Sequence, residues 1–348
     1  MKIALLTPTF SAFSGIDRVV ELQAEELINK GNKVTIFTLK AGIKPKTAKI
    51  VEMGMPNKQF FERMYRLFFF LDFPKIKKYG KMLKGYDQVI SHFYPMNWIA
   101  IYAKKHYKTR YVYYNHGIAY PELFSNILER IYMGIFKKLT NYTIKKSDSV
   151  ISISEFLRKE LNKETGIKSK VIHDKIDTKR FHKGIPRQKM REKYGLGKNP
   201  VCLYVGRISP HKGIHLLIQA FNLVLKEMPN AKLLIVGKKT FGNYTKQLEK
   251  LASKVNPNAI IFTGFVPDQE LPYYYTDADL YTTATLWEGY DLPIVEAAAC
   301  GTPAIAFDIG AHPEIMKQEG LVKVKDVHMF KNKIISFLEK QKYRKLFK

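Results

Sequence analysis

Two acidic residues, Glu288 and Glu296, are separated by seven residues in a stretch that starts as a turn and continues as an apolar helix. Pro293 suits the first turn of that helix and Gly301 its end. Glu288 is therefore expected in a loop, and Glu296 about one turn inside the helix, where a free carboxylate would be costly. Vicinal ribose hydroxyls are suitable partners for Glu296. Backbone N–H groups of Tyr290–Leu292 would point out of the helix N-terminus, where an anion is stabilised.

A second cluster combines glycines with cations. Gly206, Arg207, Lys212 and Gly213 follow the apolar run Val201–Val205, which is typical of a buried strand. Two cations at the carboxyl end of a strand can neutralise a pyrophosphate and the charge that develops when it leaves. Because the chain is rich in charged residues, the alternative is that Arg207 and Lys212 are ordinary surface cations on a loop. The acidic pair Glu288 and Glu296 in the same half of the chain favours a diphosphate site instead.

A glycine loop follows the first apolar run of the chain. Gly15 would let the backbone approach a phosphate or a sugar at the start of a helix. The loop is not a P-loop, because the glycine spacing and the Lys-Ser/Thr pair are absent.

Strand-like runs alternate with helical stretches in two successive sets, the pattern of parallel βαβ units. The expected strands are Ile3–Leu6, Val34–Leu39, Gln88–Ser91, Arg110–Asn115, Ser149–Ile153 and Val171–Ile172, then Val201–Val205, Lys232–Val236, Ala259–Phe262, Leu280–Thr283 and Ala304–Phe307. The length of 348 residues also suits two domains. We expect an α/β protein with two Rossmann-like doubly wound domains, residues 1–180 and 201–330, and a polar linker at 181–200.

The motifs together resemble one family over nearly the whole chain. Besides the two clusters, Ser14–Arg18 resembles a Gly-Gly-x-Glu-Arg turn, Ser147–Glu155 the segment that closes the first domain, and Gly264–Pro267 the loop beside the nucleotide base. The chain resembles retaining glycosyltransferases of the GT-B fold, family 4 (group 1) type. The resemblance implies two domains facing a central cleft, a nucleoside diphosphate sugar bound by the second domain, and an acceptor bound by the first.

The resemblance also implies residue roles. Arg207 and Lys212 would hold the donor diphosphate, Glu296 the ribose, and Glu288 the transferred sugar, while His116 would reach that sugar from the first domain. His116, Arg207, Lys212 and Glu288 are the expected catalytic residues. The expected donor-binding set is Gly15, Gly206, Arg207, Lys212, Val266, Glu288, Gly289, Tyr290, Asp291, Leu292 and Glu296, with His92 and Arg18 on the acceptor side.

Several positions depart from the family pattern. Ser14 replaces a glycine, Asp291 stands where the family usually has glycine, and His173–Lys175 replaces Pro-Asn-Gly. Asp291 adds a carboxylate beside the sugar, so the identity of that sugar is left open. A helix within residues 331–348 is expected to pack back on the first domain, as the fold implies.

The net charge of +27 is unevenly distributed, because residues 1–200 hold 39 basic and 17 acidic side chains. A basic first half indicates an anionic partner. Residues 58–85 interleave aromatic and basic side chains and are expected to form either a membrane-surface helix or a core helix. The opening residues are expected to form a strand and not a signal peptide, and no apolar run is long enough to span a bilayer. We expect a cytoplasmic protein, peripheral on the inner face of the membrane, with a lipid-linked or glycan acceptor.

Cys202 and Cys300 lie in apolar runs and are expected to be buried thiols. With no Asp-x-Asp motif and no Cys/His cluster, we expect no metal and no cofactor, with the nucleotide sugar as donor substrate. The alternatives are a transferase with a soluble acceptor, a sugar-nucleotide epimerase on the same fold, and a nucleic-acid-binding protein. The last is suggested by charge alone, and no nucleic-acid module is recognisable.

Overall fold

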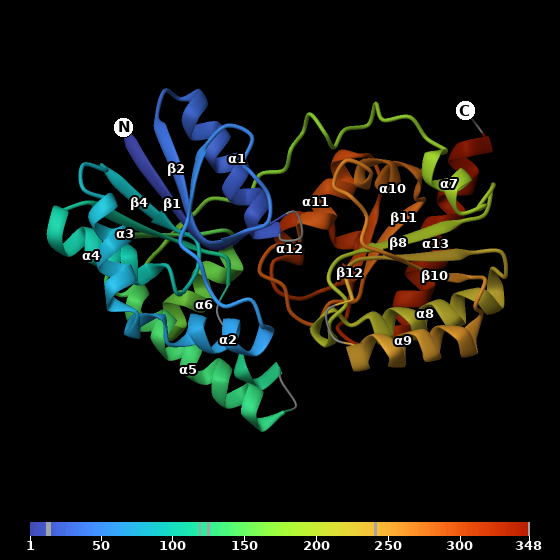
Figure 1. Cartoon of the computed structure of the whole chain (residues 1–348). Helices are drawn as coiled ribbons and strands as arrows, with labels where there is room; N and C mark the ends of the chain where they lie inside the picture. The colour runs from blue at the N-terminus through green and yellow to red at the C-terminus, as the bar shows by residue number, and fades with distance from the viewer. Residues whose placement is uncertain (12–14, 118–119, 124–125, 240–241, 347–348) are drawn as a thin grey trace. The chain divides into compact units, whose positions relative to one another are not determined.

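The structure is a computed structural model, and it describes residues 1–11, 15–117, 120–123, 126–239 and 242–346, with the backbone alone at residue 123 and residues 341–346. The chain forms two compact units, Met1–Lys175 and Ile176–Lys348. Each unit is a parallel sheet covered by helices, as Figure 1 shows.

In the described residues, the first unit has a seven-stranded sheet in the order β3-β2-β1-β4-β5-β6-β7. Its elements are β1 (Lys2–Phe10), α1 (Gly15–Asn29), β2 (Lys33–Ala41), β3 (Lys49–Glu52), α2 (Gln59–Leu67), η1 (Phe69–Leu71), α3 (Phe73–Met82), β4 (Gln88–Ser91), α4 (Asn97–Tyr107), β5 (Arg110–Asn115), α5 (Ile127–Ile144), β6 (Ser149–Ser152), α6 (Glu155–Thr165) and β7 (Lys170–Val171). All of the strand pairs are parallel.

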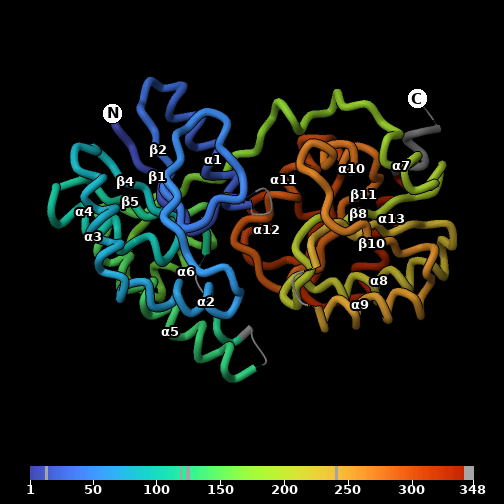
Figure 2. The backbone as a smooth tube through the Cα atoms, in the orientation of Figure 1, coloured from blue at the N-terminus to red at the C-terminus, as the bar shows by residue number. Residues whose placement is uncertain are grey.

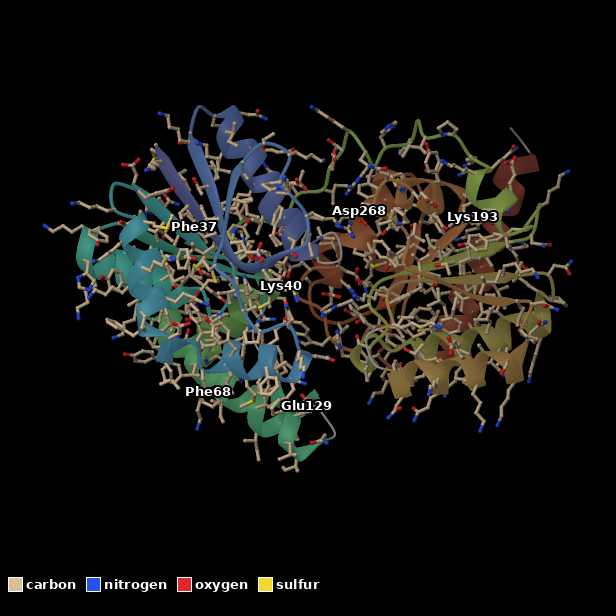
Figure 3. All side chains as sticks on the ribbon, in the orientation of Figure 1. Phe37, Lys40, Phe68, Glu129, Lys193 and Asp268 are labelled. Carbon is tan, nitrogen blue, oxygen red and sulfur yellow. The ribbon has the colours of Figure 1, made fainter. Side chains whose placement is uncertain are left out.

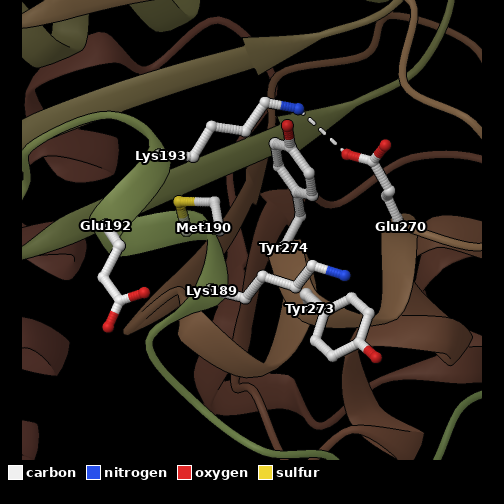
Figure 4. A pocket seen from close by; sticks show the side chains of 7 residues that line it. All are labelled: Lys189, Met190, Glu192, Lys193, Glu270, Tyr273 and Tyr274. Carbon is white, nitrogen blue, oxygen red and sulfur yellow. Dashed lines mark hydrogen bonds and ion pairs between the residues drawn. The ribbon is translucent and has the colours of Figure 1, made fainter.

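Continuous apolar runs build this sheet because helices cover both of its faces. Ala4, Leu5 and Leu6 in β1 are all buried, and Phe37 of β2, labelled in Figure 3, belongs to the same core as Ala4 and Leu6. Helices α3 and α4 pack on that side, while α1 contacts β1 and β2.

The described part of the second unit has a six-stranded sheet in the order β10-β9-β8-β11-β12-β13. Its elements are α7 (Lys189–Lys193), β8 (Val201–Val205), η3 (Pro210–Lys212), α8 (Ile214–Glu227), β9 (Lys232–Val236), α9 (Gly242–Val255), β10 (Ile260–Gly264), α10 (Leu271–Asp277), β11 (Leu280–Thr283), α11 (Leu292–Ala299), β12 (Ala304–Phe307), α12 (His312–Ile315), β13 (Leu321–Val322) and α13 (Val327–Leu346). The backbone tube in Figure 2 follows this alternation of strands and helices.

Two apolar layers flank the second sheet. One contains residues of α8, α9 and α13, and the other contains residues of α7, α10 and α11. Cys202 and Cys300 are both buried free thiols, as expected. The doubly wound architecture of both sheets is therefore confirmed, and two short edge strands, β3 and β13, were missed by the sequence analysis.

Two expectations about the domain boundaries are wrong. Residues 181–200 are no bare linker, because Phe181, Met190 and Leu196 are buried in the core of the second unit. The helix expected to pack on the first domain is α13, whose Phe330, Ile334 and Leu338 are buried in the second unit beside α8. Their spacing of four residues puts them on one face of the helix, and that face covers the sheet to which the helix belongs.

Residues 58–85 form no single helix. The chain runs through α2, the short η1 and then α3, whose first turn holds Pro74 and is capped by the carboxylate of Asp72. Leu67 and Phe69 are buried, whereas Phe60 and Phe61 are exposed. The segment thus combines a core-facing side with an exposed apolar side. No helix in the described part of the chain is both long and apolar enough to cross a membrane.

Candidate active site

The loop after β8 is fixed against the end of β11. Gly213 follows η3 with φ of +61°, and a Cβ there would lie 1.9 Å from the carbonyl oxygen of Ala284. The backbone N–H of Leu286 donates to the carbonyl of His211 at 2.8 Å. Glycine is required because it alone allows both this backbone angle and this close approach. The carboxyl ends of β8 and β11 therefore present their loops together, at the sheet edge where such folds bind ligands.

Lys212 and Glu288 form an ion pair across these two loops. Their side chains are 15% and 14% exposed, so the pair is largely removed from water. Burial lowers the pKa of Lys212, but Glu288 and Asp291 outweigh it and raise the pKa above its ordinary value. Lys212 is therefore a fixed positive charge, held by a carboxylate that an incoming anion would have to displace.

His211 lies in the same loop and is affected by both of its cations. Its pKa is lowered to about 3, first by burial and then by the charges of Lys212 and Arg207. Arg207 itself is exposed at the mouth of the loop, two residues past the end of β8. Two cations thus act on one small region, as required for holding a diphosphate.

The acidic string has the predicted local structure. Leu292 is the first residue of α11 and Pro293 the second, so Glu288, Gly289, Tyr290 and Asp291 form the loop before the helix. The buried Tyr281 of β11 has a pKa raised well above its ordinary value, first by burial and then by several charges that include Asp291, Glu288 and Glu296. The three carboxylates are therefore near one side chain of the sheet.

Glu296 lies on the fifth residue of α11 and is buried. The hydroxyl of Tyr275, from α10, donates to its Oε2 at 2.7 Å. This hydrogen bond stabilises the buried carboxylate. Tyr275 was not singled out from the sequence, where it is one of three consecutive tyrosines in an apolar stretch.

Asp291 has a partner that the sequence analysis missed. Its Oδ2 lies 3.3 Å from Nε2 of His312, which starts α12 and is fully buried. The only sequence signal was the carboxylate itself, since an aspartate placed among apolar residues needs a donor.

Val266 occupies the loop that follows β10, after Gly264 with φ of +74°. Its side chain is buried and packs into the core of the second unit. A donor contact at this position would come from the backbone.

In the first unit, the two expected histidines contact each other. His92 Nδ1 lies 2.9 Å from His116 Nε2, and His92 Nε2 lies 2.8 Å from Oε1 of Gln23. Because the Gln23 oxygen can only accept, His92 Nε2 carries the proton, and Nδ1 accepts one from His116. Asp174 Oδ2 lies 3.6 Å from His116 Nδ1. Burial and His116 lower the pKa of His92 well below its ordinary value, so the ring is neutral.

Gly15 begins α1 and Arg18 is half-buried on its first turn, while Ser14 lies outside the described residues. Between them, Asp17 accepts hydrogen bonds from the backbone N–H and the hydroxyl of Ser11, at 2.8 and 3.0 Å. Burial raises the pKa of Asp17 to about 6 despite these bonds. Among the described side chains, no group of three His, Cys, Asp or Glu residues could hold a metal ion. Independence from metal stays a prediction.

Comparisons with known proteins agree with this architecture. The family model "Glycosyltransferase Family 4" matches residues 13–180, and "Glycosyl transferases group 1" matches residues 186–348. The alpha-monoglucosyldiacylglycerol synthase of Streptococcus pneumoniae is 28% identical over 88% of this chain and 71% of its own length. A GDP-mannose-dependent alpha-(1-6)-phosphatidylinositol monomannoside mannosyltransferase of Mycolicibacterium smegmatis is 32% identical over 48% of this chain.

The chain spans about half the length of several curated relatives that it matches, and 46% of that mannosyltransferase. Among solved structures, Anabaena HepE in complex with UDP-glucose has a TM-score of 0.80 and 21% identity over 98% of this chain and 91% of its own. At that identity, the likeness shows the fold. Two family models, which between them cover both units, and the shared two-domain architecture place this chain among the GT-B glycosyltransferases of family 4, the group 1 glycosyl transferases.

Proposed function

We propose that the protein is a retaining glycosyltransferase that moves a hexosyl unit from a nucleoside diphosphate sugar to an acceptor hydroxyl. The observation that carries this proposal is the Lys212–Glu288 ion pair beside the N-terminus of α11, with Glu296 one turn inside the helix. The complex of HepE with UDP-glucose supports a nucleotide-sugar donor for this fold.

In the proposed complex, Arg207 and Lys212 bind the diphosphate, Glu296 accepts hydrogen bonds from the ribose, and Glu288 turns to the sugar hydroxyls. Glu288 can do so because the incoming phosphates replace it as the partner of Lys212. The same cation then stabilises the charge of the departing diphosphate. This supports turnover without a metal ion.

Retention by departure and attack on the same face is supported by the roles of the two carboxylates. In the proposed complex Glu288 accepts hydrogen bonds from sugar hydroxyls, and Asp291 is held by His312. Neither carboxylate is then free to attack the anomeric carbon, so a covalent glycosyl intermediate on either residue is disfavoured.

We further propose that the acceptor is lipid-linked and that the first unit docks on an anionic bilayer. Exposed apolar side chains on α2 and the first half of α5, two helices that contact each other, support this; we call them the apolar surface. They are Phe60 (67%), Phe61 (56%), Ile127 (63%), Leu128 (72%), Ile131 (54%) and Ile135 (39%). Isolated exposed apolar residues are ordinary, whereas several together on adjoining helices indicate an interaction surface.

The two helices are held together at this surface. Arg63 of α2 makes two hydrogen bonds to the carboxylate of Glu129 on α5, at 2.9 and 2.5 Å, and Tyr132 donates to the carbonyl of Arg63 at 3.2 Å. Figure 1 shows α2 beside α5, and Figure 3 labels Phe68 and Glu129 there. Exposed Lys58, Arg130 and Lys138 on or next to the same helices supply cations that complement anionic head groups.

The transfer itself is tested by mixing the protein with each sugar nucleotide and a membrane lipid extract, and measuring nucleoside diphosphate release and labelled lipid. We expect release that depends on the lipid extract. Conversion of the sugar nucleotide into its epimer without any acceptor and without net release of nucleoside diphosphate would instead indicate an epimerase. Proton NMR of the first product should show the anomeric configuration of the donor, and the opposite configuration would contradict retention.

Docking is tested by flotation with vesicles of phosphatidylglycerol and phosphatidylcholine. Wild type should float with the anionic vesicles, and Ile131→Asp should not. Met329→Asp, at an apolar position of similar exposure on α13, is the matched control and should float as wild type does. If wild type stays unbound at physiological salt, the membrane acceptor is wrong and a soluble acceptor takes its place.

A further inference from the structure

We propose that His312 is a positioning residue of the donor site, and that it shares a buried proton with Asp291 to fix the loop that contacts the sugar. The proposal rests on the proposed function, since the loop in question is the one assigned to the donor. It adds a residue outside both sequence clusters and gives a role to Asp291, the carboxylate directly before α11.

The location of the proton follows from the hydrogen bonds of His312. Its Nδ1 lies 2.6 Å from the carbonyl oxygen of Phe307, which can only accept, so Nδ1 carries a hydrogen. Its Nε2 lies 3.3 Å from Oδ2 of Asp291. A neutral ring with its hydrogen on Nδ1 would turn a lone pair toward the carboxylate. A second proton between Nε2 and Oδ2 removes this repulsion and gives a charge-assisted hydrogen bond.

The electrostatic surroundings agree with this assignment. Burial lowers the pKa of His312, but the hydrogen bond and the charge of Asp291, the Phe307 carbonyl and Glu288 raise it above the ordinary value. Both side chains are buried, His312 completely and Asp291 with 3% exposure. An unpaired aspartate at this depth would be strongly disfavoured.

The orientation of Asp291 is unusual for its place in the chain. It is the N-cap residue of α11, where an aspartate commonly accepts hydrogen bonds from first-turn amides. In the described structure, its side chain makes no such capping bond. The carboxylate of Asp291 contacts His312 instead, so the N-terminus of α11 can bind another anion. Under the proposed function this anion is the donor diphosphate.

His312 also belongs to the segment that holds Glu288. The N–H of Ala311 donates to the carbonyl of Glu288 at 3.2 Å, and a Cβ on Gly310 would lie 2.1 Å from that same oxygen. Ala311 and His312 therefore hold the two ends of the loop 288–291, Ala311 through the backbone of Glu288 and His312 through the side chain of Asp291. A change at His312 is expected to move the loop without touching substrate.

The groups that face this pair decide how its proton affects binding. They are Glu288 on the same loop, Lys212 on the loop after β8, Tyr204 on β8 and Tyr281 on β11. Arg207 acts on Lys212 and Tyr204, and Glu314 lies in the first turn of α12. Burial raises the pKa values of Tyr204 and Tyr281 well above their ordinary range, so both stay neutral at physiological pH. Loss of the His312 proton would leave the carboxylate of Asp291 uncompensated, and an anionic donor would bind less well.

The first experiment is nitrogen NMR of the ligand-free protein with labelled histidine. His312→Gln assigns the signal by its disappearance. We expect the wild-type His312 ring to carry hydrogens on both nitrogens at pH 7.5, and to carry one in Asp291→Asn. A singly protonated ring in wild type would overturn the proposal, whatever the protein binds.

The second experiment measures binding of UDP-glucose and GDP-mannose from pH 6 to 9, a range in which the diphosphate diester of a sugar nucleotide does not titrate. In wild type, the dissociation constant of the bound donor should rise with pH at those values where the pair loses its proton, and the complete loss should cost about tenfold, the effect of one charge in a partly dry site. In His312→Gln it should be raised at low pH and independent of pH. The double variant Asp291→Asn/His312→Gln, which removes the charge and keeps a hydrogen bond, should regain most of the affinity.

His328→Gln, at an exposed position of α13, is the matched control and should behave as wild type. Thermal unfolding of each variant shows whether it is folded. A wild-type pH profile retained in His312→Gln would refute the role of His312 and leave the proposed function intact. If neither these nor other sugar nucleotides bind to wild type, the proposed function fails, while the NMR result still decides where the proton lies.

Discussion

The Lys212–Glu288 pair allows stability and activity to be separated in one set of variants. In Lys212→Met, the carboxylate of Glu288 loses its cation while its side chain stays 14% exposed. Breaking a largely buried ion pair by removing one partner costs about 3–5 kcal/mol, because a charge is left without compensation. We expect the free energy of unfolding to fall by about that amount.

The double variant Lys212→Met/Glu288→Gln removes both charges and keeps the side-chain shapes. Replacing a buried pair by uncharged groups is often close to neutral, so most of the lost stability should return. Activity should not return, because the diphosphate has lost a charged hydrogen-bond donor worth about 1.5–3 kcal/mol. That range corresponds to a loss of about 10- to 150-fold in kcat/KM for the donor.

The assays are urea unfolding followed by circular dichroism, and steady-state release of nucleoside diphosphate at varied donor concentration. Lys331→Met is the matched control, because Lys331 forms an ion pair with Glu227 in the same unit, between α13 and α8. It should change kcat/KM less than twofold. The reasoning is refuted if the double variant regains full activity, or if Lys212→Met binds and turns over the donor as wild type does.

Three further results are expected. Asp17→Asn should remove a pH dependence of the stability. The pKa of Asp17 is about 6 in the native state and 3.8 ordinarily, so the native state holds more protons and the unfolding free energy falls by about 3 kcal/mol as pH rises from 3.5 to 6.5. The unfolding free energy should therefore decline more steeply with pH in wild type than in the variant. Gly213→Ala should lower the unfolding free energy by at least about 2 kcal/mol, because its Cβ would strike the Ala284 carbonyl, whereas Gly242→Ala, with open space around its Cβ, should be tolerated in the same unfolding assay. Activity should survive EDTA, and complete loss restored by magnesium or manganese would contradict a diphosphate held by Arg207 and Lys212.

The sequence predicted what depends on local pattern. Central strands such as β8 and β9 are buried on both faces, so their apolar runs are continuous and easily recognised. The edge strand β13 has two residues, Leu321 and Val322, and exists through pairing with β12. No window so short carries a periodic signal.

The residues of the site likewise fall into those that local sequence signals predicted and those that depend on long-range packing. Pro293 and Gly301 mark the ends of α11 locally, and they correctly placed Glu288 in the loop and Glu296 on the helix. His312 lies 21 residues after Asp291, and their contact requires the packing of α12 beside the start of α11. Tyr275 reaches Glu296 from another helix in the same manner. The partners of these buried carboxylates lie far away in the sequence, and therefore only the structure identified them.

The wrong expectation for the packing of α13 also came from a long-range contact that the sequence does not show. Phe330, Ile334 and Leu338 show that the helix has an apolar face, but an apolar face does not determine which domain the helix packs against. The expectation that it packs on the first domain came from the family resemblance, and the core of the second unit takes these side chains instead.

The central claim is that the second unit binds a nucleoside diphosphate sugar, with Glu296 on the ribose. Thermal unfolding of wild type, Glu296→Ala and the exposed control Glu319→Ala, each with a panel of sugar nucleotides, tests it most directly. A donor at about 100 times its dissociation constant should stabilise wild type and the control by about 2.7 kcal/mol, a shift of several degrees in Tm, and should leave Glu296→Ala unchanged. Stabilisation of Glu296→Ala equal to that of wild type, or no stabilisation of wild type by any donor, would contradict the account.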